Sequence, residues 1–123
     1  DTLFAMGCGR VIEGSMEQMW GGVEKVAKLP VDTALYCGHE YTIANAEFAM
    51  SVEPGNAALQ KRLAAVKELR AAGKPTLPTT VAEERATNPF IRVDSAEIRS
   101  NLGLEDASDA EVFAEVRTRK NNF

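Results

Sequence analysis

Histidine is nearly absent from this sequence, because His39 is the only one among 123 residues. Cysteine is scarce as well: Cys8 and Cys37 are too few for the disulfide framework of a small secreted domain, so we expect reduced, buried thiols. A cysteine nucleophile would need a base beside it, and we expect the single histidine to be used elsewhere. No apolar run approaches the length of a membrane span, and no signal-peptide pattern opens the chain. These absences predict a cytoplasmic protein without a membrane partner.

Positive charge is also in short supply. The chain has 14 lysines and arginines against 18 acidic residues, a formal net charge of −4. This balance argues against nucleic acid as a partner. The exception is the tail from Arg117 to Lys120, which places three cations in four positions. Such a cluster either complements the carboxyl end of a helix or forms a cradle for a small anion.

The first 40 residues have the pattern of a small α/β unit. Thr2–Met6 and the run that ends at Leu35–Gly38 predict two strands, with a helix between them that Pro30 ends. We expect the two strands to be adjacent, although two strands do not form a stable sheet unaided. A hydrophobic content of 45% and a length of 123 residues fit one domain, or one small domain with a remnant of another.

From Tyr41 onward the pattern predicts helices throughout, with Lys74–Pro78 as a stiff, extended connection. In the first helix of the chain, Met16, Met19 and Trp20 are expected in the core. Residues that cap helix starts recur along the chain. They are Ser15 with Gln18, Asn56 alone, Thr80 with Glu83, Asp94 with Glu97, and Ser108 with Glu111. We found no internal repeat or low-complexity tract. The fold class predicted is α+β and mostly α, divided into residues 1–40 and a helical domain of residues 41–123.

Asp1 and His39 stand at the two strand ends, where binding groups are usually displayed. Carboxylate and imidazole are ligands that a divalent metal ion accepts. A single histidine after a strand is also a common hydrogen-bonded structural residue, so residue chemistry alone leaves both interpretations open.

Several blocks of the sequence resemble one known family. They are Asp1–Phe4, Gly7–Arg10, Glu13–Gly14, Tyr36–Thr42, Val52–Asn56, Asn88–Phe90 and Arg117–Phe123. Together they look like the carboxyl-terminal half of glyoxalase II, or hydroxyacylglutathione hydrolase, a thioesterase of the metallo-β-lactamase superfamily. The resemblance covers the whole chain in order. The family's Thr-His-x-His-x-Asp-His metal motif, which lies upstream in such enzymes, is absent here.

The resemblance implies a fold, a reaction and a cofactor. The first 40 residues would be the end of an αββα sandwich, and the helical part would bind substrate. The reaction would be hydrolysis of S-D-lactoylglutathione to D-lactate and glutathione by a hydroxide that bridges two metal ions. Zinc is the expected metal, with iron or manganese as alternatives. We expect this chain to be inactive alone and to bind the two ions incompletely.

The resemblance also implies roles for six residues. Asp1 and His39 would be catalytic metal ligands. The substrate would be held by Arg10, Tyr41, Arg117 and Lys120. A departure is Ile12, where the family commonly has an aromatic residue that helps to hold the tripeptide.

Two other functions stay open at this stage. The chain could be a helical module that binds glutathione without catalysis, or part of a related metallo-β-lactamase-fold thioesterase with another substrate. The partner expected is a glutathione thioester. The whole protein is expected to be a monomer, and this chain to associate through exposed strand edges.

Overall fold

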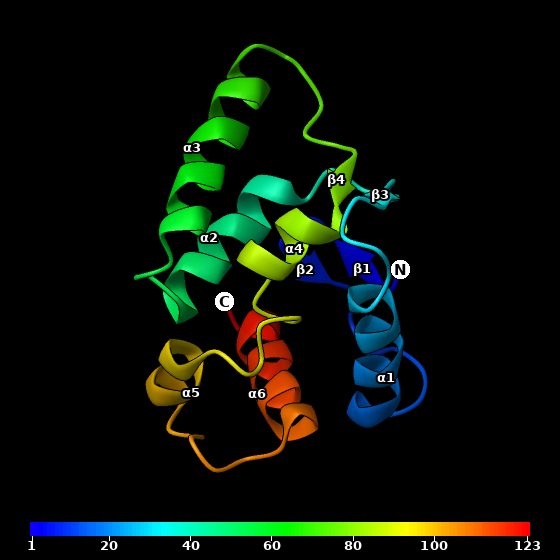
Figure 1. The fold of residues 1–123 in the computed structure, drawn as a ribbon, viewed down its shortest axis with the longest axis vertical. Coiled ribbons are helices and arrows are strands. Elements are labelled where there is room, and N and C mark those ends of the chain that lie inside the picture. Colours follow the sequence, from blue (N-terminus) through cyan, green and yellow to red (C-terminus); the bar gives the residue numbers. More distant parts are fainter.

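In the computed structural model, which describes residues 1–123, most of the chain is helical (Figure 1). The helices are α1 (Met16–Ala27), α2 (Thr42–Val52), α3 (Ala57–Ala71), α4 (Val81–Thr87), α5 (Ala96–Leu102) and α6 (Asp109–Asn121). Four short strands form two separate sheets: β1 (Leu3–Phe4), β2 (Gly7–Cys8), β3 (Ala34–Leu35) and β4 (Thr79–Thr80). The predicted fold class, α+β and mostly α, is confirmed. The division at residue 40 stays a prediction.

The strands pair differently from the prediction. β1 pairs with β2, antiparallel, because the chain reverses at Ala5–Met6 and ends the predicted strand Thr2–Met6 early. Met6 takes a left-handed conformation with φ 55°, which is uncommon for a residue other than glycine. The expected adjacency of the first strand and the strand before His39 is therefore wrong.

β3 finds its partner much later in the chain. It pairs antiparallel with β4, so that Ala34 faces Thr80 and Leu35 faces Thr79. The expectation of helix alone after Tyr41 is wrong at this point. The cause is a long-range pairing: the segment after Pro78 is already extended, and it supplies the bonds that β3 lacks.

The predicted helix starts are mostly confirmed. Ser15 and Ser108 each form a complete capping box with the residue three positions on. Asn56 and Thr80 accept hydrogen bonds from the third amide of their helices. At α5 the prediction is wrong by one residue, because the Oγ of Ser95, not the carboxylate of Asp94, accepts from the Ile98 amide.

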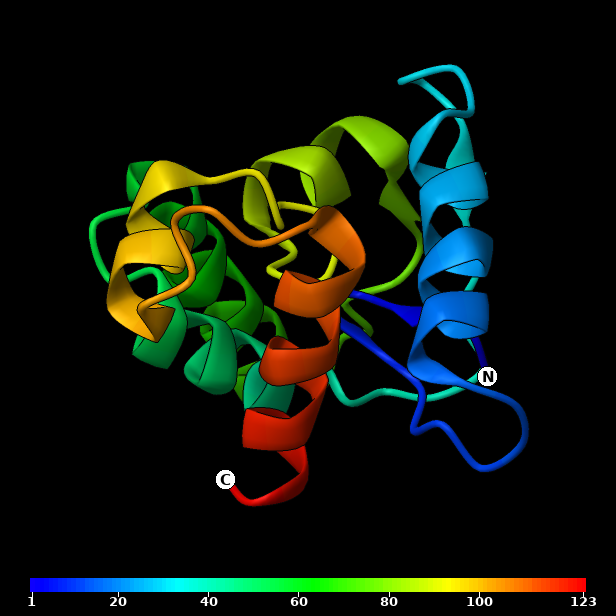
Figure 2. The ribbon, with the colours of Figure 1, turned by 90° about the horizontal axis from the view of Figure 1, so that it is seen from below.

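Two hydrophobic cores hold the helices together. The larger core lies among α1, α2, α5 and α6, and its rings include Phe90 and Phe113, with centroids 5.8 Å apart. Met16, Met19 and Trp20 of α1 pack against it, as expected. Figure 2 shows α6 between α1 and the α2–α5 side of the molecule.

The smaller core joins α2 and α3, which pack side by side, and Met6 from the hairpin completes it. Each core thus combines residues from the first 40 positions with residues of the later helices.

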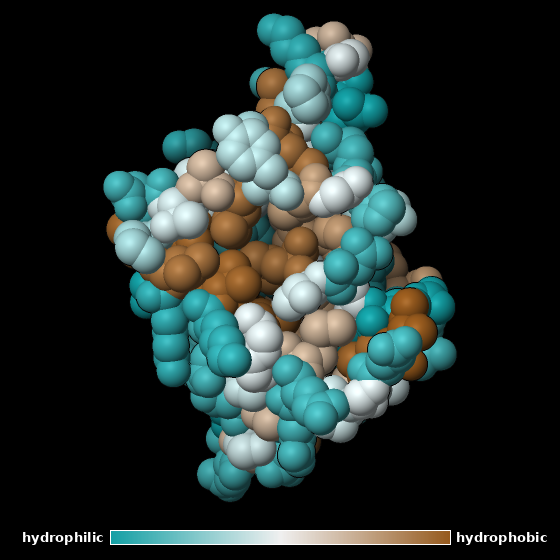
Figure 3. All heavy atoms as spheres, turned by 90° about the vertical axis from the view of Figure 1, so that its right-hand side faces the viewer, coloured by the Kyte–Doolittle hydropathy of each residue, from teal (hydrophilic) through white to brown (hydrophobic).

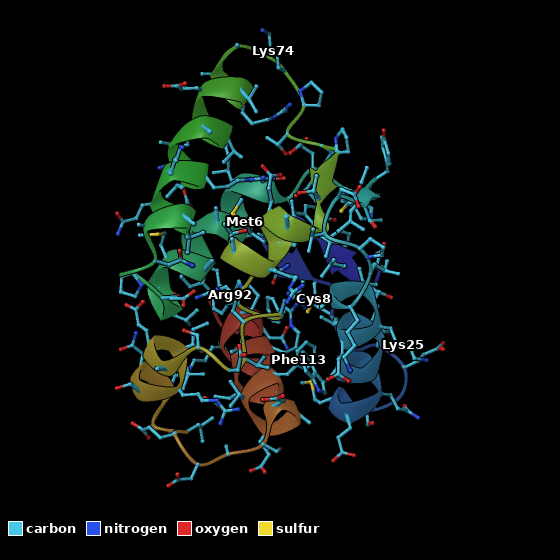
Figure 4. The ribbon with its side chains drawn as sticks, viewed as in Figure 1. Met6, Cys8, Lys25, Lys74, Arg92 and Phe113 are labelled. Atoms are coloured by element: carbon cyan, nitrogen blue, oxygen red, sulfur yellow. The ribbon has the colours of Figure 1, made fainter.

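The β1–β2 hairpin rests on three buried polar side chains. Glu84 accepts from the Met6 amide at 2.7 Å. Asn88 donates to the carbonyls of Phe4 and Gly7, at 3.2 and 3.0 Å, and Asn45 donates to that of Ala5 at 3.2 Å. Figure 4 shows Met6 and Cys8 on this hairpin, in the middle of the molecule. Because these bonds satisfy the turn's buried backbone groups, the hairpin is fixed against α2 and α4.

The face with α1 and β3 carries apolar side chains gathered around a hollow (Figure 3). The large apolar residues that the whole molecule exposes are Ile12, Leu29, Val31, Tyr36, Tyr41 and Phe123. Association of this chain through its strand edges stays a prediction. None of the helices combines the length and the apolar character needed to cross a membrane.

Candidate functional site

Asp1 and His39 lie side by side, as expected. The Nε2 atom of His39 is 3.4 Å from the Oδ2 atom of Asp1. Asp1 directly precedes the β1–β2 hairpin, and His39 lies in the loop between β3 and α2. Their side chains are 65% and 43% exposed, so both can still bind a further group. Although their strands do not pair, the fold brings the two predicted ligands together.

Two aromatic rings orient the imidazole. Tyr41 stacks on His39 with centroids 4.9 Å apart and planes 12° apart. Phe4 meets both rings edge-on, at 5.5 Å from His39 and 5.3 Å from Tyr41. Such contacts favour one orientation of each ring. Phe4 is buried beneath the pair and was not among the predicted site residues.

A cavity of about 430 Å³ opens next to this pair. Five of the six predicted site residues line it, and the sixth, His39, contacts two of them. The lining is Asp1, Phe4, Cys8, Gly9, Arg10, Ile12, Tyr41, Ala44, Asn45, Arg117 and Lys120. The volume lies within the range of small-molecule sites.

Gly9 lets the two ends of the hairpin approach at the cavity wall. A Cβ atom at this position would stand 2.0 Å from the carbonyl oxygen of Asp1. The Gly9 amide also donates to the Thr2 carbonyl at 3.1 Å. A side chain here would push Asp1 away from its position.

Three cations line the same cavity as Asp1. Arg10, Arg117 and Lys120 line it, and none of the three forms an ion pair within the chain. Burial lowers the pKa of Lys120, and the charges of Arg117 and Arg10 lower it further. The Lys120 Nζ also lies 5.7 Å from the ring centres of Phe48 and Phe123. Three crowded cations without carboxylate partners form a favourable site for an anion.

Arg117 has a structural role that the sequence did not reveal. It is only 3% exposed, and its Nη1 donates to the carbonyls of Cys8 and Gly9 at 2.7 and 3.3 Å. Its Nε donates to Asn121 Oδ1 at 3.1 Å, and its guanidinium lies 5.2 Å from the Phe90 ring centre. Arg117 therefore ties α6 to β2, and its Nη2 alone makes no hydrogen bond within the chain.

Cys8 is an inert member of the lining. Burial raises the pKa of its thiol to about 11, although the Arg117 charge and hydrogen bond oppose the shift. A thiol with so high a pKa is a poor nucleophile at neutral pH. This agrees with the expectation that cysteine carries no chemistry here.

Asn45 was also missed by the sequence reasoning. It is buried at the cavity wall, and its amide nitrogen holds the Ala5 carbonyl. A usable signal existed, because Asn45 stands four residues after Tyr41 and so shares its helix face. Ile12 is 89% exposed at the cavity rim, where it offers apolar surface without a ring or a hydroxyl.

Few side chains of this chain are placed where they could bind a metal ion. No group of three or more His, Cys, Asp or Glu side chains is arranged to hold an ion. The Asp1–His39 pair has suitable donors for a borderline divalent ion, since it combines a carboxylate with an imidazole. The pair fits as part of a metal site, and a complete site needs further ligands from elsewhere.

Comparison with known proteins adds the family. Residues 40–123 match the family described as hydroxyacylglutathione hydrolase C-terminus. Over all 123 residues the chain is 55% identical to hydroxyacylglutathione hydrolases of Methylococcus capsulatus and Mesorhizobium japonicum, and covers 48% of each. It is 54% identical to that of Rhizobium meliloti, with the same coverage. The chain thus spans about half the length of the curated relatives it matches. On this evidence the chain belongs to the hydroxyacylglutathione hydrolase family.

Proposed function

We propose that this chain supplies the substrate cavity and part of the metal site of an enzyme that hydrolyses 2-hydroxyacyl glutathione thioesters. The substrate is S-D-lactoylglutathione, and the products are D-lactate and glutathione. One observation carries the proposal: a single cavity joins the Asp1–His39 pair to three unpaired cations. The names of the relatives support the substrate class.

The charges of the cavity match those of glutathione. The tripeptide carries two carboxylates, and Arg10, Lys120 and the free Nη2 of Arg117 offer donors for them. Charge-assisted hydrogen bonds of this kind are shorter and stronger than neutral ones. With the carboxylates at the basic side, the thioester extends toward Asp1 and His39. This charge match supports the proposed direction of the substrate in the cavity.

Asp1 and His39 form the part of the site that would bind metal. They would bind divalent ions, with zinc proposed and iron or manganese as alternatives, together with ligands beyond this chain. When bound, such an ion makes hydroxide available near neutral pH and polarises the thioester carbonyl. Phe4 and Tyr41 fix the imidazole, so His39 presents its nitrogen in one direction. The exposed Tyr41 ring also offers a hydroxyl to the substrate at the cavity.

The test uses the complete hydrolase that contains this chain. Asp1→Asn and His39→Gln should lose bound metal and lower kcat by at least about a hundredfold, because the ion that activates water is lost. Asp32→Asn is the matched control, since Asp32 is exposed and lies away from the cavity. Lactoylglutathione hydrolysis and metal content are measured together. Full activity of the Asp1→Asn and His39→Gln variants would refute the proposed site.

A second function, binding of glutathione without catalysis, suits the isolated chain. Residues of this chain form a cavity, whereas only two candidate metal ligands come together. Calorimetric titration of the chain with glutathione tests this directly. Binding that weakens with added salt supports it, and absence of heat at millimolar glutathione contradicts it. The two free thiols, Cys8 and Cys37, support a reducing, cytoplasmic setting for the enzyme.

A further inference from the structure

The loop that carries His39 has few attachments of its own. Residues 36–40 make no backbone–backbone hydrogen bond, and the first such bond after β3 is from the Asn45 amide to the Tyr41 carbonyl. A loop without backbone bonds opens at low cost. Side-chain contacts must therefore hold this loop, and those of the His39 ring with Phe4 and Tyr41 do not anchor its backbone.

The side chain of Glu40 supplies the attachment. Its Oε2 accepts from the Thr76 amide at 3.1 Å, and its Oε1 accepts from the Thr76 hydroxyl. Thr76 Oγ1 also lies 2.6 Å from Thr42 Oγ1. Because a hydroxyl has one proton and a carboxylate only accepts, Thr76 donates to Glu40 and accepts from Thr42. Both oxygens of Glu40 are thus bound to one residue across the chain.

The place of Glu40 in the chain suits this task. It stands between His39 and Tyr41, whose rings stack on each other with centroids 4.9 Å apart. Because Glu40 is bonded to both residues in the chain, fixing its side chain on Thr76 restricts the positions of His39 and Tyr41. Thr76 is a firm support, because it is buried and Pro75 and Pro78 stiffen its segment.

We propose that Glu40, held by Thr76 and Thr42, is a positioning residue that keeps His39 and Tyr41 at the cavity. The proposal rests on the proposed function for its effect on catalysis. Its structural part, the placement of the imidazole, can be tested without that function. Glu40 is exposed and its side chain does not line the cavity, so a role in substrate binding does not compete.

The kinetic test uses the complete hydrolase. Glu40→Ala and Thr76→Val should lower kcat by about tenfold to a hundredfold, as the loss of groups that orient a ligand does. The proposed function assigns substrate binding mainly to the three cations, so KM should change by less than about threefold. Thr76→Ser keeps both donors and should restore most of kcat, whereas Glu40→Gln keeps one of the two acceptor oxygens and should restore kcat in part. Glu47→Ala is the matched control, because Glu47 is an exposed glutamate of α2 whose side chain makes no hydrogen bond or ion pair.

The structural test uses the single histidine of this chain. Stacking on Tyr41 shifts the imidazole proton resonances of His39, which no other histidine overlaps. In Glu40→Ala and Thr76→Val these resonances should move toward the values of an unstructured peptide at the same pH, and in Glu47→Ala they should stay. Unchanged resonances in Glu40→Ala would overturn the proposal.

The two tests separate the two proposals. Moved resonances with a wild-type hydrolase that does not cleave lactoylglutathione would refute the proposed function and leave the positioning role. An active wild type with unchanged kcat in Glu40→Ala and Thr76→Val would refute the positioning role. A Thr76→Val variant that does not fold leaves the decision to Glu40→Ala, whose exposed side chain is removed without a buried gap.

Discussion

Replacing Lys120 by alanine tests the basic side of the cavity with little disturbance of the fold. The Lys120 ammonium makes no hydrogen bond or ion pair within the chain and only faces the rings of Phe48 and Phe123. Loss of these contacts should cost about 1 kcal/mol of stability or less. A lost charge-assisted bond to a glutathione carboxylate costs roughly 1.5–3 kcal/mol, or about tenfold to a hundredfold in affinity.

The assay is steady-state hydrolysis of lactoylglutathione by the complete hydrolase, with thermal unfolding in parallel. KM should rise in Lys120→Ala while kcat changes far less, because the proposed substrate direction puts the thioester at Asp1 and His39 and a carboxylate at Lys120. Arg119→Ala is the control, since Arg119 is exposed and pairs with Glu115 on the same helix. A purely structural role at the carboxyl end of α6 predicts a small loss of stability and an unchanged KM. That outcome would refute the reasoning.

Arg117→Ala should behave differently from Lys120→Ala. The substitution leaves the buried carbonyl of Cys8 without its donor and removes one of the two donors to that of Gly9, which costs roughly 1–3 kcal/mol of stability. It also frees β2 from α6, so KM and stability should change together. The comparison of the two variants separates binding from scaffolding, and an Arg117→Ala variant as stable as the wild type would contradict the structural role.

Three further predictions concern metal and stability. Zinc titration of the isolated chain should leave less than one equivalent bound after dialysis, because Asp1 and His39 are only two ligands; two retained equivalents would contradict this. Glu84→Ala should lower the free energy of unfolding in urea by roughly 2–3 kcal/mol, because it leaves the buried Met6 amide unpaired, whereas Glu84→Gln should cost less. Burial alone would raise the pKa of Glu53, but hydrogen bonds from Arg92 and other donors outweigh burial and lower it below 4.5. The folded state therefore holds this proton less tightly than the unfolded state, so the stabilisation is complete above the unfolded pKa and is lost as pH falls through the folded pKa. Glu53→Gln should show a smaller loss of stability on acidification than the wild type.

The helices could be predicted because their signals are local. Ser15 and Ser108 cap helices through bonds to residues three positions away, and Gly103 ends α5 with φ 70°. At α5 two adjacent residues were both suitable caps, and sequence alone did not separate Asp94 from Ser95. Such local bonds depend on spacing and residue type, which the sequence displays.

The strands could not be predicted because their pairing depends on distant residues. The left-handed position of the first turn is Met6 and not a glycine, and its unusual conformation is held by Glu84, 78 positions away. The pairing of β3 with β4 likewise joins segments that are far apart in the chain. Long-range bonds of this kind override local patterns.

The residues of the candidate site could be predicted from the sequence, but the residues that hold them in place could not. Asp1 and His39 were assigned from residue type and resemblance, and their contact agrees with that assignment. The roles of Phe4, Glu40 and Arg117 as supports follow from side-chain directions and burial, which a sequence does not display. The roles of the six predicted site residues in catalysis and substrate binding stay predictions.

The central claim is that one cavity joins two metal ligands, Asp1 and His39, to the cations that bind glutathione. These cations are Arg10, Arg117 and Lys120. A crystal structure of the complete hydrolase with metal and glutathione, with anomalous diffraction at the zinc edge, tests it most directly. The account predicts an anomalous peak bonded to Asp1 and His39, roughly 2 Å from each ligand atom. It also predicts glutathione in the cavity, with carboxylates against Lys120 and Arg10. A metal bound away from Asp1 and His39, or glutathione on another surface, would contradict it.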